Sequence, residues 1–242
     1  SLQQALKKFP PIRLRANGGV REWLEDYDEA SPNHRHTSHL LALYPYEQIS
    51  LDKTPELAVG ARKTIEDRLA AEGWEDTEWS RANMICFYAR LKDAKEAYQS
   101  ILTLESIFTR ENLLSISPAG IAGAPYDIFI LDGNAAGAAG IAEMLVQGHE
   151  GYIEFLPCLP EQWNVGNYKG LCVKGGGEVS ADWNQSLINE ATLKAIVDNT
   201  FTVKVPQGKD YTITLNNKQI DPAINNGLIT VSMKAKDILK FK

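Results

Sequence analysis

Three of the four histidines and one arginine fall within six residues of this sequence. His34, Arg35, His36 and His39 belong to the stretch NHRHTSHLLALYP, whose second half is apolar and ends at a proline. Imidazole and guanidinium groups at the start of a helix are typical of a site that binds an anion or a hydroxyl-rich ligand. The stretch is therefore the first candidate site.

Metal binding is one interpretation of this cluster. His34, His36 and His39 could supply three nitrogens, but separations of two and three residues fit neither one helix face nor a common zinc pattern. No cysteine or closely spaced acid completes the set, so the sequence predicts no metal and no cofactor. Two interpretations stay open: the histidines hold a loop and a helix start, or Arg35 and His36 donate hydrogen bonds to hydroxyl groups.

A second candidate is the segment LDGN. Asp132 follows the apolar run Ile128–Leu131, and a carboxyl group that ends a buried run can have its pKa tuned by its surroundings. Gly133 is expected to form a tight turn, and Asn134 is expected to cap the helix that follows. The alternative is that these residues form a turn and a cap and nothing more.

Two further segments combine aromatic and charged residues. Trp79 and Arg81 lie in DTEWSR, and Trp23 lies in the acid-rich run Glu22–Glu29. An indole face can stack on a sugar ring while acids and arginine bind its hydroxyl groups, although a tryptophan on a helix is more often part of the core. For the acidic run, the alternative is a solvated surface.

Composition excludes several classes of partner. The 242 residues carry a net charge of −6 with no basic stripe, which argues against nucleic acid. No apolar run reaches eighteen residues, so no membrane span is expected. The three cysteines show no CxxC spacing, and Cys86, Cys158 and Cys172 are expected to be buried as small apolar residues.

The hydrophobic period changes near residue 150, from helical spacing to alternation. Expected helices are Leu2–Phe9, His39–Tyr44, Thr54–Gly73, Thr77–Leu91, Ala94–Leu104 and Gly137–Gln147. Expected strands are Tyr152–Leu156, Leu171–Lys174, Glu178–Trp183, Ile188–Ile196, Thr200–Val205, Tyr211–Leu215, Leu228–Met233 and Ile238–Phe241. The sequence thus predicts a multidomain α and β protein, with a helical domain over 1–150 and an antiparallel β-sandwich domain over 151–242.

Four blocks in order resemble one family. They are EWLEDYDEASPNHRHTSHLLALYP, DTEWSRANMICFYARLKDAKEAY, LDGNAAGAAGIAEMLVQGH and FLPCLPEQWNVGNYKGLCVKGGGEVSADW. Together they look like the C-terminal portion of glycoside hydrolase family 95, which contains α-L-fucosidases and some α-L-galactosidases. The resemblance covers about residues 20–190. It implies part of an (α/α)6 toroid followed by a β-domain, and an inverting hydrolysis of glycans.

The resemblance also implies roles for individual residues. Asp132 matches the aspartate that works on the base side of the reaction, and Asn134 is grouped with the sugar-binding residues. Arg35 and His36 match residues that bind the sugar in the −1 subsite. Trp79 and Arg81 are expected to support the pocket wall.

The chain departs from the family pattern at two places. Ala135 and Ala136 follow DGN where Phe-Gly is usual, which alters one wall of the pocket. Glu78 stands before the tryptophan where glycine is usual. These changes leave the choice between L-fucose and L-galactose open.

The family's general acid and its water-positioning asparagines lie upstream of the histidine block. The chain is therefore expected to be a C-terminal portion that is inactive alone, and its exposed helix faces are expected to pair with the missing N-terminal part or with another copy. The resemblance places the complete enzyme outside the cell or in the periplasm. The alternative function is a non-catalytic helical-plus-β module that binds glycans or a partner chain.

Overall fold

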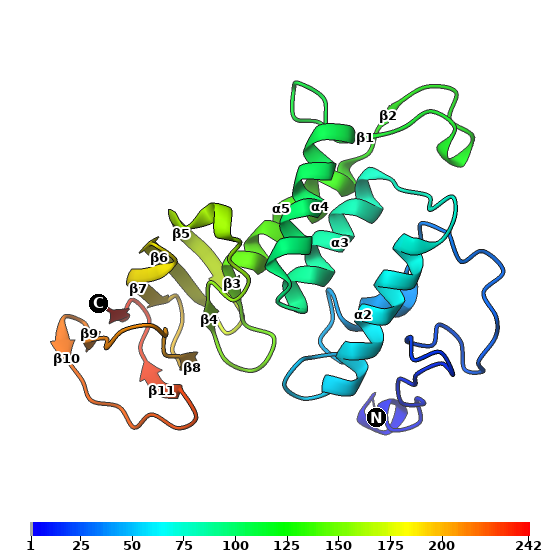
Figure 1. The fold of residues 1–242 in the computed structure, drawn as a ribbon. Coiled ribbons are helices and arrows are strands. Elements are labelled where there is room, and N and C mark those ends of the chain that lie inside the picture. The colour runs from blue at the N-terminus through cyan, green and yellow to red at the C-terminus, as the bar shows by residue number, and fades with distance from the viewer. Residues whose placement is uncertain (1) are drawn as a thin grey trace.

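The computed structural model describes residues 2–242, with residue 122 described by its backbone alone. A helical part precedes a β part along the chain, and the two lie side by side (Figure 1). The helices are α1 Leu2–Leu6, η1 Ser38–Ala42, α2 Pro55–Ala70, α3 Glu78–Arg90, α4 Ala94–Ile107, η2 Ile121–Gly123, α5 Leu131–Leu145 and η3 Glu161–Trp163, where η marks a 3-10 helix. Each of the six expected helical segments is present, but α5 begins at Leu131 instead of Gly137.

The strands follow the predicted alternation closely. They are β1 Ile116–Ser117, β2 Ile128–Phe129, β3 Val146–Gln147, β4 Glu154–Phe155, β5 Val165–Val173, β6 Gly177–Asn184, β7 Leu187–Ala195, β8 Asn199–Lys204, β9 Ile213–Leu215, β10 Lys218–Gln219, β11 Leu228–Met233 and β12 Ile238–Phe241. The β part holds a six-stranded sheet in the order β10-β9-β12-β7-β6-β5 and a two-stranded sheet, β11-β8. All strand pairs within these two sheets are antiparallel.

The two sheets share one hydrophobic core. Alternate residues of β6 are buried, as expected for a strand with one face against a core. Val179 and Leu193 of the larger sheet lie in the same buried cluster as Val203 and Ile229 of the smaller one. The β part is thus built from two apposed antiparallel sheets.

The helical part has a core of its own, in which α3 is buried on almost every side. The two cores interleave along the chain, because Val146 belongs to the β core while Cys158 belongs to the helical one. The boundary between residues 150 and 151 stays a prediction. Cys86 and Cys158 are buried as expected, whereas Cys172 is exposed, so that part of the expectation was wrong.

Two glycines let α3 and α5 approach closely. A Cβ atom on Gly133 would lie 2.8 Å from Cγ of Glu78, and one on Gly140 would lie 2.6 Å from Cγ2 of Ile85. Gly133 and Gly140 are seven residues apart, and so are their partners Glu78 and Ile85. The two helices therefore run in the same direction with their N-termini together (Figure 1). Because interiors are close-packed, a side chain at either glycine would push the helices apart.

The far end of α5 is closed by the β part. Strand β3 follows the helix directly, and the last helical carbonyls face the chain beyond β4. The N–H of Leu156 donates to the Leu145 carbonyl at 2.8 Å, and the N–H of Cys158 donates to the Met144 carbonyl at 3.2 Å. These bonds satisfy acceptors that a helix end leaves unpaired.

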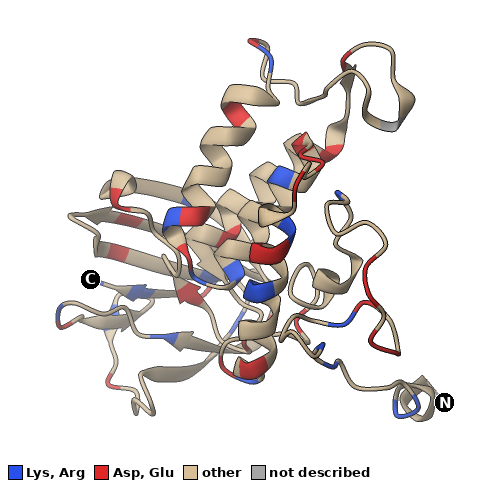
Figure 2. Ribbon diagram, turned by 45° about the vertical axis from the view of Figure 1, so that its right-hand side comes forward, with Lys and Arg blue, Asp and Glu red and all other residues tan. Residues whose placement is uncertain are grey.

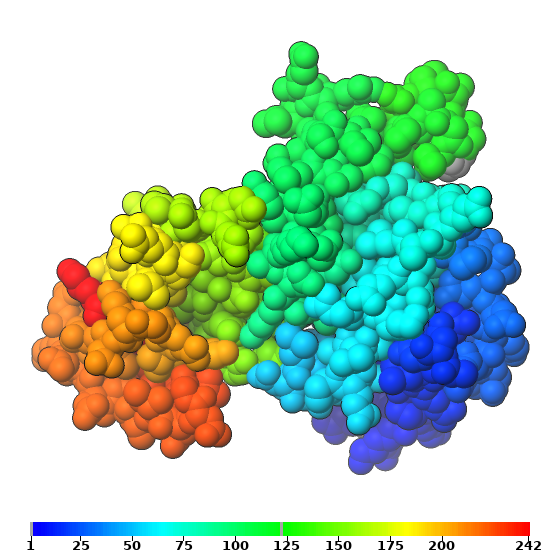
Figure 3. All heavy atoms as spheres, viewed as in Figure 1, coloured from blue at the N-terminus to red at the C-terminus, as the bar shows by residue number. Residues whose placement is uncertain are grey.

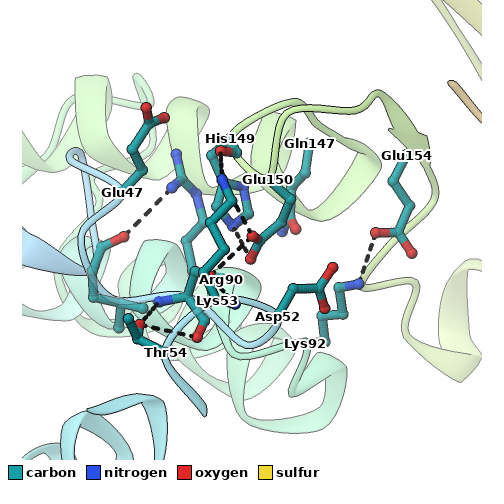
Figure 4. Close-up of polar contacts among 12 residues, drawn as sticks. Glu47, Asp52, Lys53, Thr54, Arg90, Lys92, Gln147, His149, Glu150 and Glu154 are labelled. Atoms are coloured by element: carbon teal, nitrogen blue, oxygen red, sulfur yellow. Dashed lines mark hydrogen bonds and ion pairs between the residues drawn. The ribbon is translucent and has the colours of Figure 1, made fainter. Parts of the chain in front are cut away.

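Polar side chains tie the two parts together at their junction (Figure 4). Glu154 accepts from Lys92, two residues after the end of α3, at 2.7 Å and from Lys204 of β8 at 2.8 Å. Glu150 accepts from Ser50 at 2.9 Å and lies beside the buried His149. The parts are therefore held by charge-assisted bonds as well as by apolar contact.

Charged residues of both signs are interspersed over both parts of the protein (Figure 2). Within residues 2–242, the structure contains no helix that is long and apolar enough to cross a membrane.

The close approach of α3 and α5 can be tested at Gly140. In an open helix interior, replacing glycine with alanine stabilises by roughly 0.5–1 kcal/mol. Here the added Cβ would meet Ile85 at 2.6 Å, so we expect Gly140→Ala to lower the free energy of unfolding. The expected loss in urea denaturation is about 1–3 kcal/mol, as for overpacking.

Gly148→Ala is the matched control, because a Cβ there meets nothing within 4 Å. It should leave the unfolding midpoint nearly unchanged. A Gly140→Ala protein as stable as the control would contradict the contact.

Candidate functional site

The histidine loop, residues 33–39, is hydrogen-bonded to the segment that precedes α3. The backbone N–H of Glu75 donates to the Asn33 carbonyl at 2.9 Å, and the Asn33 amide donates to the Gly73 carbonyl at 3.1 Å. Arg35 donates to the Glu75 carboxylate at 2.8 Å. This bond holds the pKa of Glu75 below its ordinary value. Arg35 therefore has a fixed direction, with part of its guanidinium fork still available to a ligand.

His36 lies exposed at the surface beside an aromatic neighbour. Its ring meets the edge of Trp79 at a centroid distance of 4.6 Å and stacks on His34 at 4.8 Å. The backbone N–H of His36 donates to Nδ1 of His34 at 3.1 Å. Partial burial, with His34 and Arg35 close by, lowers the pKa of His36. A neutral imidazole offers one donor and one acceptor to a ligand.

A buried arginine of α2 donates hydrogen bonds to the backbone of this loop. Arg68 of α2 is only 3% exposed, pairs with Glu29 at 2.9 Å, and donates to the carbonyls of Ser31 and His34. His39 is also buried, and burial lowers its pKa. Arg68 was not among the predicted site residues, because its helical spacing alone does not show that it reaches a loop more than thirty residues away.

The start of α3 is fixed by local bonds. Thr77 and Ser80 form a capping box, in which each side chain accepts from the other residue's backbone N–H. Arg81 pairs with Asp76 in the turn that leads into the helix. Arg81 thus holds the first turn of α3, which carries Trp79.

The start of α5 differs from what the sequence suggested. Leu131, Asp132 and Gly133 are the first three residues of the helix, with Ile130 at the N-cap position. The expected buried run Ile128–Leu131 is wrong, because Phe129 and Leu131 are exposed. The expected tight turn at Gly133 is also wrong, since this glycine is helical and buried against α3.

The cap of α5 comes from a distant residue instead of Asn134. The Ser115 hydroxyl accepts from the Asn134 N–H at 3.1 Å and lies 2.6 Å from the Ile130 carbonyl, to which it donates. The Asn134 side chain accepts from the Ser115 N–H at 2.9 Å and donates to the Leu113 carbonyl at 2.8 Å. The prediction of Asn134 as a cap was wrong because Asn134 lies inside the helix. Its amide joins α5 to the loop before β1.

Asp132 stands one residue into α5 with its side chain exposed. Among residues 2–242 it has no hydrogen-bond or ion-pair partner, although its charge acts on the neighbouring Glu78. A carboxylate in the first turn interacts favourably with the helix dipole. The position suits a carboxylate that must face a ligand or a water molecule.

The structure brings three of the predicted segments together. His36 contacts Trp79, and the residue before Trp79, Glu78, packs against Gly133 and interacts electrostatically with Asp132. The histidine loop, the α3 start and the α5 start are therefore linked by one chain of contacts. The acid-rich segment contacts the histidine loop as well: Glu22 accepts from Ser38 and lies 3.9 Å from Nδ1 of His39, while Trp23 is 62% exposed.

Two clefts are lined by residues outside this contact chain. One of about 570 Å³ lies between α4 and residues 159–162, and one of about 400 Å³ lies beside Arg15 and Arg68. Within residues 2–242, no group of three or more His, Cys, Asp and Glu side chains could hold a metal ion.

Comparison with known families covers almost the whole chain. The glycosyl hydrolase family 95 catalytic domain matches residues 1–145, and the family 95 C-terminal domain matches residues 147–240. The chain belongs to glycoside hydrolase family 95. The catalytic-domain match contains every predicted site residue of this family 95 chain.

Curated relatives in the family carry fucosidase names. The chain is 33% identical to Alpha-L-fucosidase 2 of Arabidopsis thaliana over 189 residues, which is 77% of this chain and 22% of the relative. It is 30% identical to Probable alpha-fucosidase A of Aspergillus niger, covering 73% of this chain and 23% of the relative. It is 25% identical to the Aspergillus oryzae protein of the same name, covering 78% of this chain and 28% of the relative. The family 95 chain thus spans about a quarter of the length of the relatives it matches.

Asn134 and Asp132 are expected to respond differently to alanine. Asn134→Ala removes the acceptor of the Ser115 N–H and the donor to Leu113, so we expect a loss of about 1–3 kcal/mol in the free energy of unfolding. Asp132→Ala removes an exposed side chain and should cost less than about 1 kcal/mol, the size of a helix-dipole contribution. Urea denaturation of both variants measures the difference, and equal losses would contradict the structural role of Asn134.

Proposed function

We propose that this chain is the C-terminal part of an inverting glycoside hydrolase that releases α-linked L-fucose, or L-galactose, from glycans. The observation that carries the proposal is the succession of the family 95 catalytic and C-terminal domains along the chain. The printed names of the relatives point to α-fucosides. The exposed carboxylate of Asp132, linked through Glu78 and Trp79 to His36, supports it.

Asp132 acts on the base side of this reaction. In inverting hydrolysis one carboxylate activates a water molecule while a second carboxyl group protonates the leaving oxygen from the opposite side. Two such groups stand roughly 6.5–9.5 Å apart, which leaves room for the water. Asp132 is exposed and forms no ion pair within the described chain, as suits a carboxylate that activates the water molecule.

Arg35 and His36 bind the sugar in this proposal. Arg35 is already aimed by Glu75, so binding costs little additional side-chain ordering. His36, kept neutral over a wider pH range by its lowered pKa, can donate to one hydroxyl group and accept from another. Trp79 forms part of the wall, Arg81 holds the turn beneath it, and Asn134 fixes the loop that borders Asp132.

The helices α2–α5 are proposed to form part of an (α/α)6 toroid, and residues 151–242 a β-sandwich. The helical part supports this with exposed apolar side chains, which include Ile107, Leu113, Tyr126 and Leu131. Several of them belong to residues 107–131, a segment that projects from the molecule in Figure 3. An apolar surface of this kind is suited to cover by further helices of the enzyme or by another copy.

The general acid is proposed to lie on a segment of the enzyme outside these 242 residues, so the chain alone should not turn over a glycoside. Secretion or export of the complete enzyme stays a prediction that rests on the family resemblance.

The role of Asp132 predicts a large loss of activity in the complete enzyme. Asp132→Asn preserves the shape of the side chain but removes the base, so kcat on an aryl α-L-fucoside should fall about 10²–10⁴-fold. Circular dichroism should stay unchanged. Asp210→Asn, at an exposed aspartate of the β part, is the control and should retain activity. Near-normal turnover by Asp132→Asn would reject the assignment.

The isolated 242-residue chain gives a second test. We expect no hydrolysis of the same aryl fucoside above background. Turnover would show that the acid lies within the chain. Fucose binding in calorimetry, combined with an inactive complete enzyme, would favour the non-catalytic glycan-binding module instead.

A further inference from the structure

Glu78 is the most unusual carboxyl group in the structure. Its side chain is fully buried at the first position of α3, and neither carboxyl oxygen has a hydrogen-bond partner at normal geometry within residues 2–242. Buried charges in proteins are almost always paired, because an isolated buried carboxylate is costly. The surroundings of Glu78 therefore favour its uncharged form.

The groups around Glu78 come from three elements. From α5, Gly133 packs against the Glu78 side chain, and Asp132 supplies the nearby negative charge. From the strand region, Ser115 also faces Gly133, and the Ser117 hydroxyl lies close to the carboxyl group. On its own segment, the charges of Asp76 and Arg81 neutralise each other in an ion pair.

These surroundings raise the pKa of Glu78 above its ordinary value of 4.5. Burial is the largest cause, and the Asp132 carboxylate adds to it. The first amides of α3 and the Ser117 hydroxyl oppose the shift. The charge of Asp132 thus acts on Glu78, and of these two groups only Asp132 is exposed to water.

We propose that Glu78 is a positioning residue for Asp132: its uncharged form seats the first turn of α5 against α3, and its ionisation repels Asp132 and displaces that turn. The contact through Gly133 transmits the change, because the glycine leaves no space between the two helices. Glu78 itself, being fully buried, does not touch the substrate. Its effect on catalysis rests on the proposed role of Asp132, but its effect on the α5 start does not.

Stability gives the first test, in the 242-residue chain. Since the folded state holds the Glu78 proton more tightly than the unfolded state, this stabilisation is complete below pH 4.5 and is lost as the pH rises through the folded pKa. Glu78→Gln removes this loss. The melting temperature of Glu78→Gln relative to wild type should therefore rise between pH 4 and pH 8.

Glu105→Gln is the matched control, because Glu105 is an exposed glutamate of α4. Its difference from wild type should not change over that pH range. A Glu78→Gln difference as constant as that of the control would overturn the buried, uncharged state of Glu78.

Coupling to Asp132 gives the second test. Carbon-13 NMR of the Glu78 carboxyl group follows its titration in wild type and in Asp132→Asn. Removal of the Asp132 charge should move the Glu78 midpoint to lower pH, since that charge helps to raise it. An unchanged midpoint would overturn the coupling, whatever the activity of the enzyme.

The complete enzyme gives the third test. In wild type kcat should fall on the alkaline side as Glu78 ionises, while Glu78→Gln should keep kcat to higher pH with KM little changed. Glu78→Ala, which leaves a cavity, should lose activity at every pH. Identical alkaline limbs in wild type and Glu78→Gln would overturn the positioning role. If the wild type does not hydrolyse fucosides, the proposed function fails, while the first two tests still decide on Glu78.

Discussion

The contact between α3 and α5 is the constraint on which the rest of the helical part depends. Gly133 and Gly140 occur at a spacing of seven residues, and each meets a residue of α3 at the same spacing. Two parallel helices in this register bring their N-termini to the same end of the molecule. Trp79 and Asp132 come from distant parts of the sequence, and the starts of their helices meet because these glycines have no side chain.

The site is then completed by long-range polar contacts. Arg68 reaches the backbone of the histidine loop from α2, and Ser115 caps α5 from the loop before β1. Each contact satisfies a backbone group that local sequence leaves unpaired. The half-buried Arg35 and the exposed His36 and Asp132 therefore rest on groups such as Arg68 and Ser115 that are removed from water.

Much of the fold could be predicted because its signals are local. Thr77 begins α3 as its capping residue, and alternation placed strands such as Leu228–Met233 at their observed bounds. What failed was the LDGN segment, since Asp-Gly-Asn has the composition of a turn. The tertiary contact of Gly133 with α3 outweighs that local preference. Likewise, the departure at Glu78 was visible in the sequence, but its complete burial depends on the packing of α5.

The closure of α5 by Leu156 and Cys158 has a consequence for the order of folding. A chain that emerges from the ribosome from its N-terminus presents all of α5 before the residues that satisfy its last carbonyls. The carbonyls of Met144 and Leu145 therefore stay bonded to water until about a dozen further residues, including β3 and β4, have been synthesised. During translation, the end of the last helix gains its protein partners only with the first hairpin of the β part.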